Sequence, residues 1–403
     1  MEWKEVRLGD VCNIITGFPF PGKKYSKEGI RVVRGDNVTI GNLRWDTEKD
    51  KRWNEPFDKT EYYSLQANDI VIGMDGSRVG KNKARIKEED LPLLLAQRVA
   101  CVRHNELAEQ DYLYYNIFSK KFIDYVNSTH TGSAIPHISQ KQIEDYMILL
   151  PDIETQRRIA SILSSLDRKI ELNNKINADL EEMAQAIFKN WFVDFEPFKD
   201  GKFVDSELGM IPEGWEVGTL TEIASYINGL AMQKYPPENI EYSLPVLKIK
   251  ELGQGFCGTD SDRCSCNIKD ECRIHNGDVI FSWSGTLLVD VWCGGDCGLN
   301  QHLFKVTSKD YPKWFYYYWT KHHLREFIHI AKDKAVTMGH IKRGHLEEAM
   351  VAIPDNDSME KAHELFEPIL SKMISLRLEN SRLSLLRDTL LPRLMSGEIE
   401  VPQ

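Results

Sequence analysis

The chain has 403 residues, 42% hydrophobic and 28% charged, so it is long enough for two or three folded domains and too apolar to be disordered. Its 51 basic and 61 acidic side chains give a formal net charge of -10, which argues against a protein that coats nucleic acid through bulk charge. Apolar runs such as 93–96 are far shorter than the ~20 residues of a membrane span, and residues 1–5 begin no secretory signal. We therefore expect a cytoplasmic protein.

The first ~150 residues alternate short apolar bursts with Gly, Asn, Asp and Pro, as strands alternate with turns. The β-branched segments 30–33, 69–72 and 98–102 predict three of the strands. Between residues 111 and 126, the spacing of Leu113, Ile117, Phe118 and Phe122 predicts a helix with one apolar face. This part of the chain is therefore expected to be an α+β domain.

A long helix is predicted next, with Asp152 as its N-cap after Pro151. Beyond Asp152, apolar residues and two asparagines recur at alternating steps of four and three, which is a heptad seam, and the same seam returns 203 residues further on. Asparagine in such a seam fixes the register of a helix pair, although each helix covering only its own domain is an alternative. The residues expected to pair the helices and dock subunits are Leu163, Leu166, Ile170, Asn173, Asn177 and Leu180, with Phe366, Ile369, Met373, Leu376, Asn380 and Leu383.

The two halves of the chain are copies of one unit. The matches are Trp3 and Gly17 with Trp215 and Gly229 (offset 212), Gly76-Ser77 with Gly285-Thr286 (209), Ala96-Gln97-Arg98-Val99 with Asn300-Gln301-His302-Leu303 (204), and His137-Ile138 with His340-Ile341 (203). An offset that shrinks in small steps indicates loops of different length on a shared scaffold. We expect an α+β architecture in which two similar globular domains, 1–150 and 199–353, alternate with two helical segments, 151–198 and 354–403. The helices are expected to pair as an antiparallel coiled coil with pseudo-two-fold symmetry.

Six of the eight cysteines lie between Cys257 and Cys297. No pair in this cluster has the C-x2-C spacing of most structural zinc sites, so we interpret the cysteines as small buried thiols and expect no metal. A metal site in the cluster stays open as the alternative.

Three stretches resemble type I restriction-modification specificity subunits. Residues 135–198, IPHISQKQIEDYMILLPDIETQRRIASILSSLDRKIELNNKINADLEEMAQAIFKNWFVDFEPF, closely resemble the central conserved region of that family, and 379–401, ENSRLSLLRDTLLPRLMSGEIEV, resemble its distal conserved region. The openings WKEVRLGDVCNIITG and GWEVGTLTEIASYING are similar to the starts of its two target recognition domains. One departure is that 154–156 (Glu-Thr-Gln) has no counterpart near 356–358, so the junction into the second helix is expected to make different contacts.

The resemblance implies a non-catalytic DNA sequence-specificity subunit of a system that defends against phage. Each recognition domain would read one part of a bipartite, asymmetric site in double-stranded DNA, while the helices space the domains and dock two methyltransferase subunits. Restriction subunits with translocase and endonuclease activity would join this complex. S-adenosylmethionine, ATP and Mg²⁺ are expected in those partners and no cofactor in this chain. The alternatives are a self-contained nuclease or methyltransferase, and a coiled-coil scaffold that binds protein.

Catalytic motifs are not assembled in the sequence. Tyr235-Pro236-Pro237 does not fit the Asp/Asn-Pro-Pro-aromatic loop of amino-methyltransferases, and the glycine-rich stretch 17–24 has Lys24 where a phosphate loop needs Ser or Thr. We therefore predict no catalytic residue in this chain.

DNA contact is expected from basic and polar loops, because base edges and phosphates are bound by Arg, Lys, Ser and Thr on close-approaching backbone. Residues 1–150 carry 22 basic and 22 acidic side chains, and residues 206–355 carry 15 and 20, so neither half is expected to bind DNA strongly alone. A solvated surface charge is the alternative for each residue. The predicted DNA-binding residues are Lys23, Lys24, Arg44, Arg52, Ser77, Arg78, Lys81, Lys83, Thr129 and Ser133 in the first half, and Ser284, Thr286, Lys334, Thr337, Lys342 and Arg343 in the second.

Overall fold

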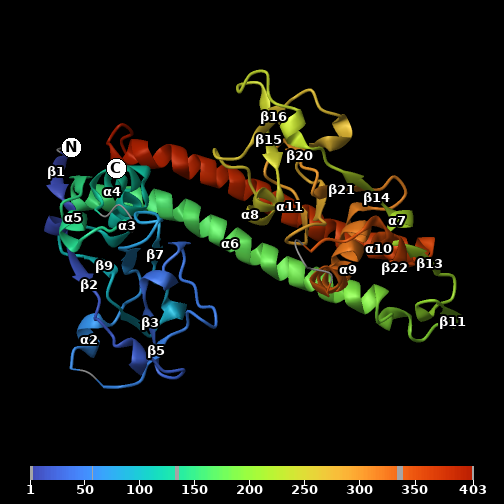
Figure 1. Cartoon of the computed structure of the whole chain (residues 1–403), viewed down its shortest axis with the longest axis horizontal. Helices are drawn as coiled ribbons and strands as arrows, with labels where there is room; N and C mark the ends of the chain where they lie inside the picture. The colour runs from blue at the N-terminus through green and yellow to red at the C-terminus, as the bar shows by residue number, and fades with distance from the viewer. Residues whose placement is uncertain (1–2, 57, 132–135, 334–338, 402–403) are drawn as a thin grey trace. The chain divides into compact units, whose positions relative to one another are not determined.

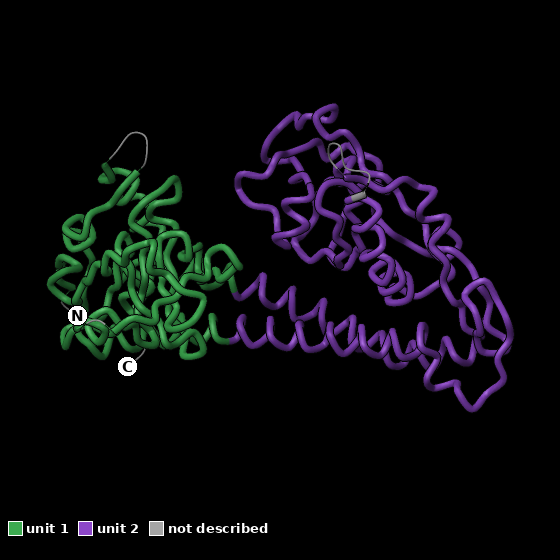
Figure 2. Tube along the Cα trace, turned by 60° about the horizontal axis from the view of Figure 1, so that its bottom comes forward, with its two compact units in different colours: residues 1–168, 384–403 green, residues 169–383 purple. Residues whose placement is uncertain are grey.

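A computed structural model describes residues 3–56, 58–131, 136–333 and 339–401, and these group into two compact units (Figures 1 and 2). Unit 1 consists of residues 1–168 and 384–403, and unit 2 of residues 169–383. Two helices, α6 (Ile153–Phe192) and α11 (Asn356–Met395), each contribute residues to both units. Among the helices described, none is both long and apolar enough to cross a bilayer.

Unit 1 is built on a five-stranded sheet in the order β2-β9-β6-β7-β4 and a three-stranded sheet in the order β5-β3-β8, with β1 and β10 paired separately. The sheet neighbours are antiparallel except β3–β8 and β4–β7. The strands are β1 (Lys4–Arg7), β2 (Cys12–Thr16), β3 (Ile30–Val33), β4 (Ile40–Gly41), β5 (Arg52–Trp53), β6 (Ile70–Gly73), β7 (Lys83–Arg85), β8 (Leu93–Leu95), β9 (Val99–His104) and β10 (Met147–Leu150). The helices are α1 (Leu8–Val11), α2 (Thr60–Tyr63), α3 (Gln110–Phe118), α4 (Lys120–Thr129) and α5 (Gln140–Glu144).

The three predicted strands are confirmed as β3, β6 and β9 within two residues, and the helical stretch expected over 111–126 is confirmed except for a break at Ser119. That segment is two helices, because α3 ends at Phe118 and Ser119 begins α4. The Ser119 side chain accepts a hydrogen bond from Phe122 N at 3.2 Å, which is the N-cap arrangement that starts a new helix. Leu113, Ile117 and Phe122 are nevertheless all buried in one core.

Unit 2 repeats the plan of unit 1. Its sheets have the orders β14-β21-β18-β19 and β16-β15-β20-β17, with β13–β22 paired like β1–β10 and β15–β20 parallel like β3–β8. Its strands are β11 (Phe203–Ser206), β12 (Gly209–Pro212), β13 (Glu216–Thr219), β14 (Ser225–Asn228), β15 (Ser243–Leu247), β16 (Arg263–Ser265), β17 (Arg273–Ile274), β18 (Val279–Ser282), β19 (Leu288–Val291), β20 (Cys297–Leu299), β21 (Leu303–Thr307) and β22 (Met350–Ile353). Its helices are α7 (Leu220–Ile223), α8 (Ile249–Gln254), α9 (Lys313–Asp333) and α10 (Arg343–Glu348).

A glycine fixes the same backbone crossing in both units. Gly17 N donates to Val99 O at 3.2 Å in unit 1, and Gly229 N donates to Leu303 O at 3.0 Å in unit 2. A Cβ on either glycine would lie 2.2 Å from a carbonyl oxygen, that of Ala96 or Asn300. Only glycine permits that approach, so the matching pair in the sequence reflects a shared steric constraint.

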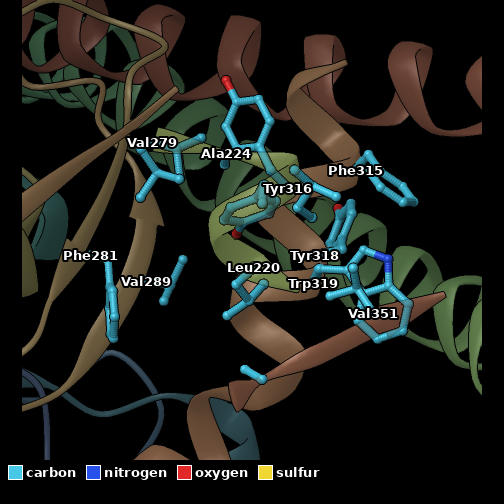
Figure 3. Packing of buried hydrophobic residues seen from close by; sticks show 14 of the residues in the cluster. Leu220, Ala224, Val279, Phe281, Val289, Phe315, Tyr316, Tyr318, Trp319 and Val351 are labelled. Atoms are coloured by element: carbon cyan, nitrogen blue, oxygen red, sulfur yellow. The ribbon is translucent and has the colours of Figure 1, made fainter. Parts of the chain in front are cut away.

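The core of unit 2 is rich in aromatic side chains from α9, the helix that packs on the sheet β14-β21-β18-β19. Figure 3 shows Trp319 of α9 near Val351, with Phe315, Tyr316 and Tyr318 in the same cluster. From the helical segments, Phe366 stacks on Trp314 with ring centroids 4.7 Å apart. The helices therefore pack on the domain of unit 2 as well as on each other.

The antiparallel helix pairing is visible within each unit. In unit 2, Asn173 Nδ2 donates to Asn380 Oδ1 and to Glu379 Oε2, both at 2.9 Å, while Phe188 lies beside Phe366 further along. The sum of paired residue numbers stays nearly constant, as antiparallel pairing requires. None of the residues predicted to pair the helices is exposed; these are Leu163, Leu166, Ile170, Asn173, Asn177, Leu180, Phe366, Ile369, Met373, Leu376, Asn380 and Leu383.

In unit 1, the pair of helices is fastened by a charged contact. Arg387 Nη1 donates to Asp167 Oδ1 at 2.8 Å, and Tyr115 OH donates to Asp167 Oδ2 at 2.7 Å. Nearby, Leu163 and Leu394 are buried in one small core. Asp167 is thus a structural residue between α3, α6 and α11.

The two long helices begin with matching caps but different neighbours. Asp152 Oδ1 accepts a hydrogen bond from Thr155 N at 2.9 Å, and Asp355 Oδ1 accepts one from Ser358 N at 2.8 Å. The next residue differs, because Gln156 is buried and its amide bonds Leu107 O, Pro151 O and Glu109 N, whereas Met359 packs on the apolar core of unit 2. This confirms that the junctions make different contacts.

All eight cysteines are free thiols, and Cys264, Cys272, Cys293 and Cys297 of the cluster are buried while Cys257 and Cys266 are partly exposed. Within the described ranges, no three His, Cys, Asp or Glu side chains gather as ligands of a metal ion would.

Candidate nucleic-acid interface

Unit 1 contains a cleft of about 800 Å³, called here the unit 1 cleft. Its walls come from the loop after β2, the loops before and after β4, the loop after β6, and the turn between β8 and β9. The polar and charged residues that line it are Tyr25, Arg34, Asp36, Thr39, Arg44, Asp75, Ser77, Arg78, Asn82, Gln97 and Arg98. Loops on a rigid sheet scaffold are where binding residues are usually carried.

The lining of the unit 1 cleft carries four arginines and two aspartates, so it is positive although residues 1–150 are neutral. Arg34 lies over the Tyr25 ring at 5.7 Å, and Arg44 Nη2 donates to Asp36 O at 3.3 Å. Arginine forks and amides such as Gln97 are the side chains that bind phosphates and base edges. The cleft therefore has the chemistry of a nucleic-acid surface.

Unit 2 contains a cleft at the equivalent place, called here the unit 2 cleft, with a volume of about 540 Å³. It is lined by the loop after β14, by β15 and its exit, by the start of β16, and by the turn between β20 and β21. Its lining residues are Met232, Gln233, Pro236, Pro237, Val246, Lys248, Asp262, Arg263, Asn300, Gln301 and His302. The turn Ala96-Gln97-Arg98 and its repeat Asn300-Gln301-His302 thus occupy the same wall of the two clefts.

Three of the predicted DNA-binding residues, Arg44, Ser77 and Arg78, come together in the unit 1 cleft and are exposed. The remaining candidates of unit 1 that the structure describes lie outside it. Lys23, Lys24 and Lys81 are exposed, with Lys24 paired to Glu55 at 2.7 Å; Arg52 makes a two-pronged contact with Asp50; and the Thr129 hydroxyl donates to Tyr125 O.

Lys83 is a correction, because a DNA contact was predicted and the residue is only 3% exposed. Its Nζ donates to Ile117 O at 2.6 Å and lies over the Phe118 and Phe122 rings at 5.3 and 5.0 Å. Burial lowers the pKa of Lys83 to about 7. The Lys83 side chain therefore lies inside the domain, against the C-terminal end of α3, and not on the surface.

Ser284 is a second correction. It is 6% exposed, and its backbone carbonyl accepts a hydrogen bond from Ser282 Oγ at 3.2 Å. Thr286, Lys342 and Arg343 are exposed but lie outside the unit 2 cleft. Ser133, Lys334 and Thr337 fall outside the described residues.

Residues that sequence reasoning missed are Gln97 and Arg98 in unit 1 and Gln301 and His302 in unit 2. The signal was present, because this turn is one of the segments that repeat between the halves and its glutamine is identical in both. Positive charge does not mark this turn, because it contains one arginine in unit 1 and, in unit 2, a histidine, which is not permanently charged.

The sequence profile of the type I restriction modification DNA specificity domain matches residues 1–182 and again 212–380. The chain therefore belongs to that family, whose domain occurs in it twice. As a member, it is a specificity subunit, the non-catalytic component of a type I restriction-modification complex.

Relatives cover most of the chain. It is 31% identical over 312 residues to the type I restriction enzyme MjaIX specificity subunit of Methanocaldococcus jannaschii. The matched region covers 73% of this chain and 70% of that protein. It is 23% identical to the HindI specificity subunit of Haemophilus influenzae over 99% of this chain and 100% of that protein. Among solved structures, the S subunit from M. genitalium has the same fold, with a TM-score of 0.55 at 15% identity, covering 98% of this chain and 96% of that one.

Proposed function

We propose that the unit 1 cleft and the unit 2 cleft each bind one half of a bipartite, asymmetric site in double-stranded DNA. The observation that carries this proposal is the repeat of the cleft itself. Both units place the same turn, with the same glutamine, on the wall of a cleft, while the other lining residues differ. A shared scaffold with different lining residues is what two readers of two different sequences require.

Within this proposal, partner subunits supply the catalytic activities and much of the affinity for DNA. Two methyltransferase subunits dock on the helical segments, and restriction subunits with translocase and endonuclease activity join them. S-adenosylmethionine, ATP and Mg²⁺ are assigned to these partners. Because residues 1–150 are neutral and 206–355 carry five more acidic than basic side chains, the isolated chain makes few net phosphate contacts.

The direct test is to co-express this chain with its cognate methyltransferase subunit and to map methylated bases across the host genome. We expect one motif made of two different half-sites separated by a spacer of fixed length. Methylation that follows a single undivided motif, or that is random, would contradict two separate readers. Expression of the methyltransferase subunit without this chain is the matched control and should give no motif.

The helices set the spacer in this proposal, and an insertion tests that role. Seven residues added after Arg168 in α6 and seven after Leu383 in α11 keep the heptad phase of both seams. One heptad adds ~10 Å at ~1.5 Å per residue, which is about three base pairs at ~3.4 Å each. We expect a spacer longer by about three base pairs and unchanged half-sites, whereas an unchanged spacer would contradict the role of the helices.

The salt dependence of DNA binding tests the division of labour with the partners. The logarithm of the affinity falls with the logarithm of salt concentration in proportion to the number of phosphates neutralised. We expect a shallow slope for the isolated chain and a steeper one once the methyltransferase subunits are added. Equal slopes would assign the phosphate contacts to this chain instead.

A further inference from the structure

One arginine of the unit 1 cleft is held in a strained and well-anchored position. Arg98 has φ 66°, a left-handed conformation that costs free energy in a residue with a Cβ. Its Nη1 donates to Asp75 Oδ2 at 2.7 Å, and His137 Nδ1 donates to the other oxygen of the same carboxylate. The Asp75 side chain is 19% exposed and that of Arg98 is 69% exposed. Asp75 therefore anchors one edge of a guanidinium that is otherwise largely exposed and lines the cleft.

The same backbone hydrogen bonds surround this cluster in the two units. Met74 N donates to Arg98 O and Ile138 N to Met74 O in unit 1; Trp283 N donates to His302 O and Ile341 N to Trp283 O in unit 2. The bridge between Asp75 and His137 likewise recurs between Ser284 and His340. Asp75, Arg98 and His137 thus correspond in space to Ser284, His302 and His340.

The side chains at these corresponding positions differ in kind. Unit 2 has the buried Ser284 where unit 1 has a carboxylate, and it has an imidazole where unit 1 has a guanidinium. His302 Nε2 lies 3.3 Å from Gln301 Nε2, and its Nδ1 has no partner among the described residues. His302 is also absent from the described non-glycine residues with positive φ, so the strain at Arg98 belongs to unit 1 alone.

The chemistry of the anchored arginine selects its ligand. A guanidinium presents a fork of donors that matches the O6 and N7 acceptors of guanine in the major groove, and no other base offers two acceptors there. An imidazole presents one donor and one acceptor in its neutral form and cannot make that fork. Holding one edge of the guanidinium on Asp75 fixes its direction and reduces the conformational entropy lost on binding.

We propose that Arg98 reads a guanine in the half-site bound by unit 1, that Asp75 is its positioning residue, and that His302 is the corresponding specificity residue of unit 2. The inference rests on the proposed function and assigns base recognition within it. Gln97 and Gln301 are the contact that both half-sites share. The difference between the half-sites then originates at positions 75 and 98 against 284 and 302.

The test uses the assembled methyltransferase complex and duplexes randomised in the half-site of unit 1, with bound and methylated products sequenced. The wild type should show a strong preference for guanine at one position. Arg98→Ala and Arg98→Lys should reduce that preference by about 10- to 100-fold and leave the other positions and the half-site of unit 2 unchanged. Asp75→Asn should weaken the same preference in part, which a purely structural role would not do selectively. His302→Ala should alter only the half-site of unit 2.

The matched control is Arg7→Ala. Arg7 is also an arginine of unit 1 paired with an aspartate, Asp10, at 2.8 Å, and it lies outside the cleft with 48% of its side chain exposed. This variant should keep the wild-type motif. The inference is overturned if the Arg98 variants keep the wild-type preference, or if they lose all sequence preference at once. If the wild type itself gives no two-part motif, the proposed function fails instead, so the two failures are distinguishable.

Discussion

Units 1 and 2 share the plan of their scaffold and differ in the side chains that the scaffold presents. In both, an aspartate accepts a hydrogen bond from the backbone of the turn before its strand, Asp69 from Gln66 N at 2.7 Å and Asp278 from His275 N at 2.8 Å. The cation paired with that aspartate comes from different positions, Arg103 in unit 1 and Lys305 in unit 2. The hydrogen bond from the backbone to the aspartate is therefore kept in both units, while the cation paired with the aspartate differs. The scaffold is preserved, and the side chains around it have diverged.

The largest expected effect comes from breaking the shared crossing in one unit at a time. Gly17→Ala and Gly229→Ala each force a Cβ against a carbonyl oxygen and should each lower the free energy of unfolding of their own unit by about 3 kcal/mol or more. Hydrogen exchange should show lost protection in β8 and β9 for the first variant and in β20 and β21 for the second. Loss of protection at both places in either variant would contradict the independence of the units.

A second difference between the units is a buried cation. The strand pairing places Lys83 opposite Ile72 in unit 1. At the corresponding position of unit 2, Val289 lies opposite Phe281. Lys83 and Val289 are both buried. The folded pKa of Lys83 is about 7 against an ordinary value of 10.5, so between these pH values the unfolded chain binds more protons. The free energy of unfolding must therefore rise with pH in this window, and the penalty for charging Lys83 is largest below pH 7.

Replacing Lys83 by Met should remove that pH dependence. We expect the unfolding free energy of the wild type, relative to Lys83→Met, to increase by about 2 kcal/mol between pH 7 and pH 9, measured by chemical denaturation. Lys81→Met, which alters an exposed lysine two residues away, is the control and should show little change with pH. A flat difference between wild type and Lys83→Met would mean that water reaches the ammonium group in solution.

The smallest effect is expected where the units agree, at the caps of their long helices. Asp152→Ala and Asp355→Ala each remove one N-cap hydrogen bond and should each cost about 1 kcal/mol of stability, detectable as a shift in the denaturation midpoint. Asp152→Asn and Asp355→Asn retain a capping side chain and should recover most of the loss. Unequal losses at the two caps would show that Gln156 and Met359 contribute to starting the helices.

The sequence was sufficient for the architecture because the architecture is repeated. Two heptad seams of equal spacing predicted the helix pair, and the segments that recur between the halves include the glycine crossing and the turn that carries Gln97 and Gln301. These features depend on local sterics and periodicity, which a single sequence records directly.

The candidate site was less predictable, because the charge of a side chain does not show whether it points to solvent or into the interior. Lys83 stands in a basic, glycine-rich stretch, yet its side chain points beneath α3, and Ser284 is buried beside a loop that is exposed. The sequence does not single out Arg98, because the role proposed for it depends on a positive φ and on a contact with Asp75, which is distant in sequence. Whether a polar side chain faces solvent or the interior is decided by tertiary packing, and the sequence gives no period from which to read it.

The division of unit 1 into residues 1–168 and 384–403 has a consequence for synthesis on the ribosome. Leu394 and Val401 complete a core with Tyr112 and Leu163, so this core stays open until residues 394–401 have emerged. All residues of unit 2 are made in the interval. Because folding during synthesis proceeds as segments become available, the two larger cores of unit 1, whose buried residues lie between Leu8 and Ile148, should form first, while this small core leaves an apolar surface that chaperones would recognise.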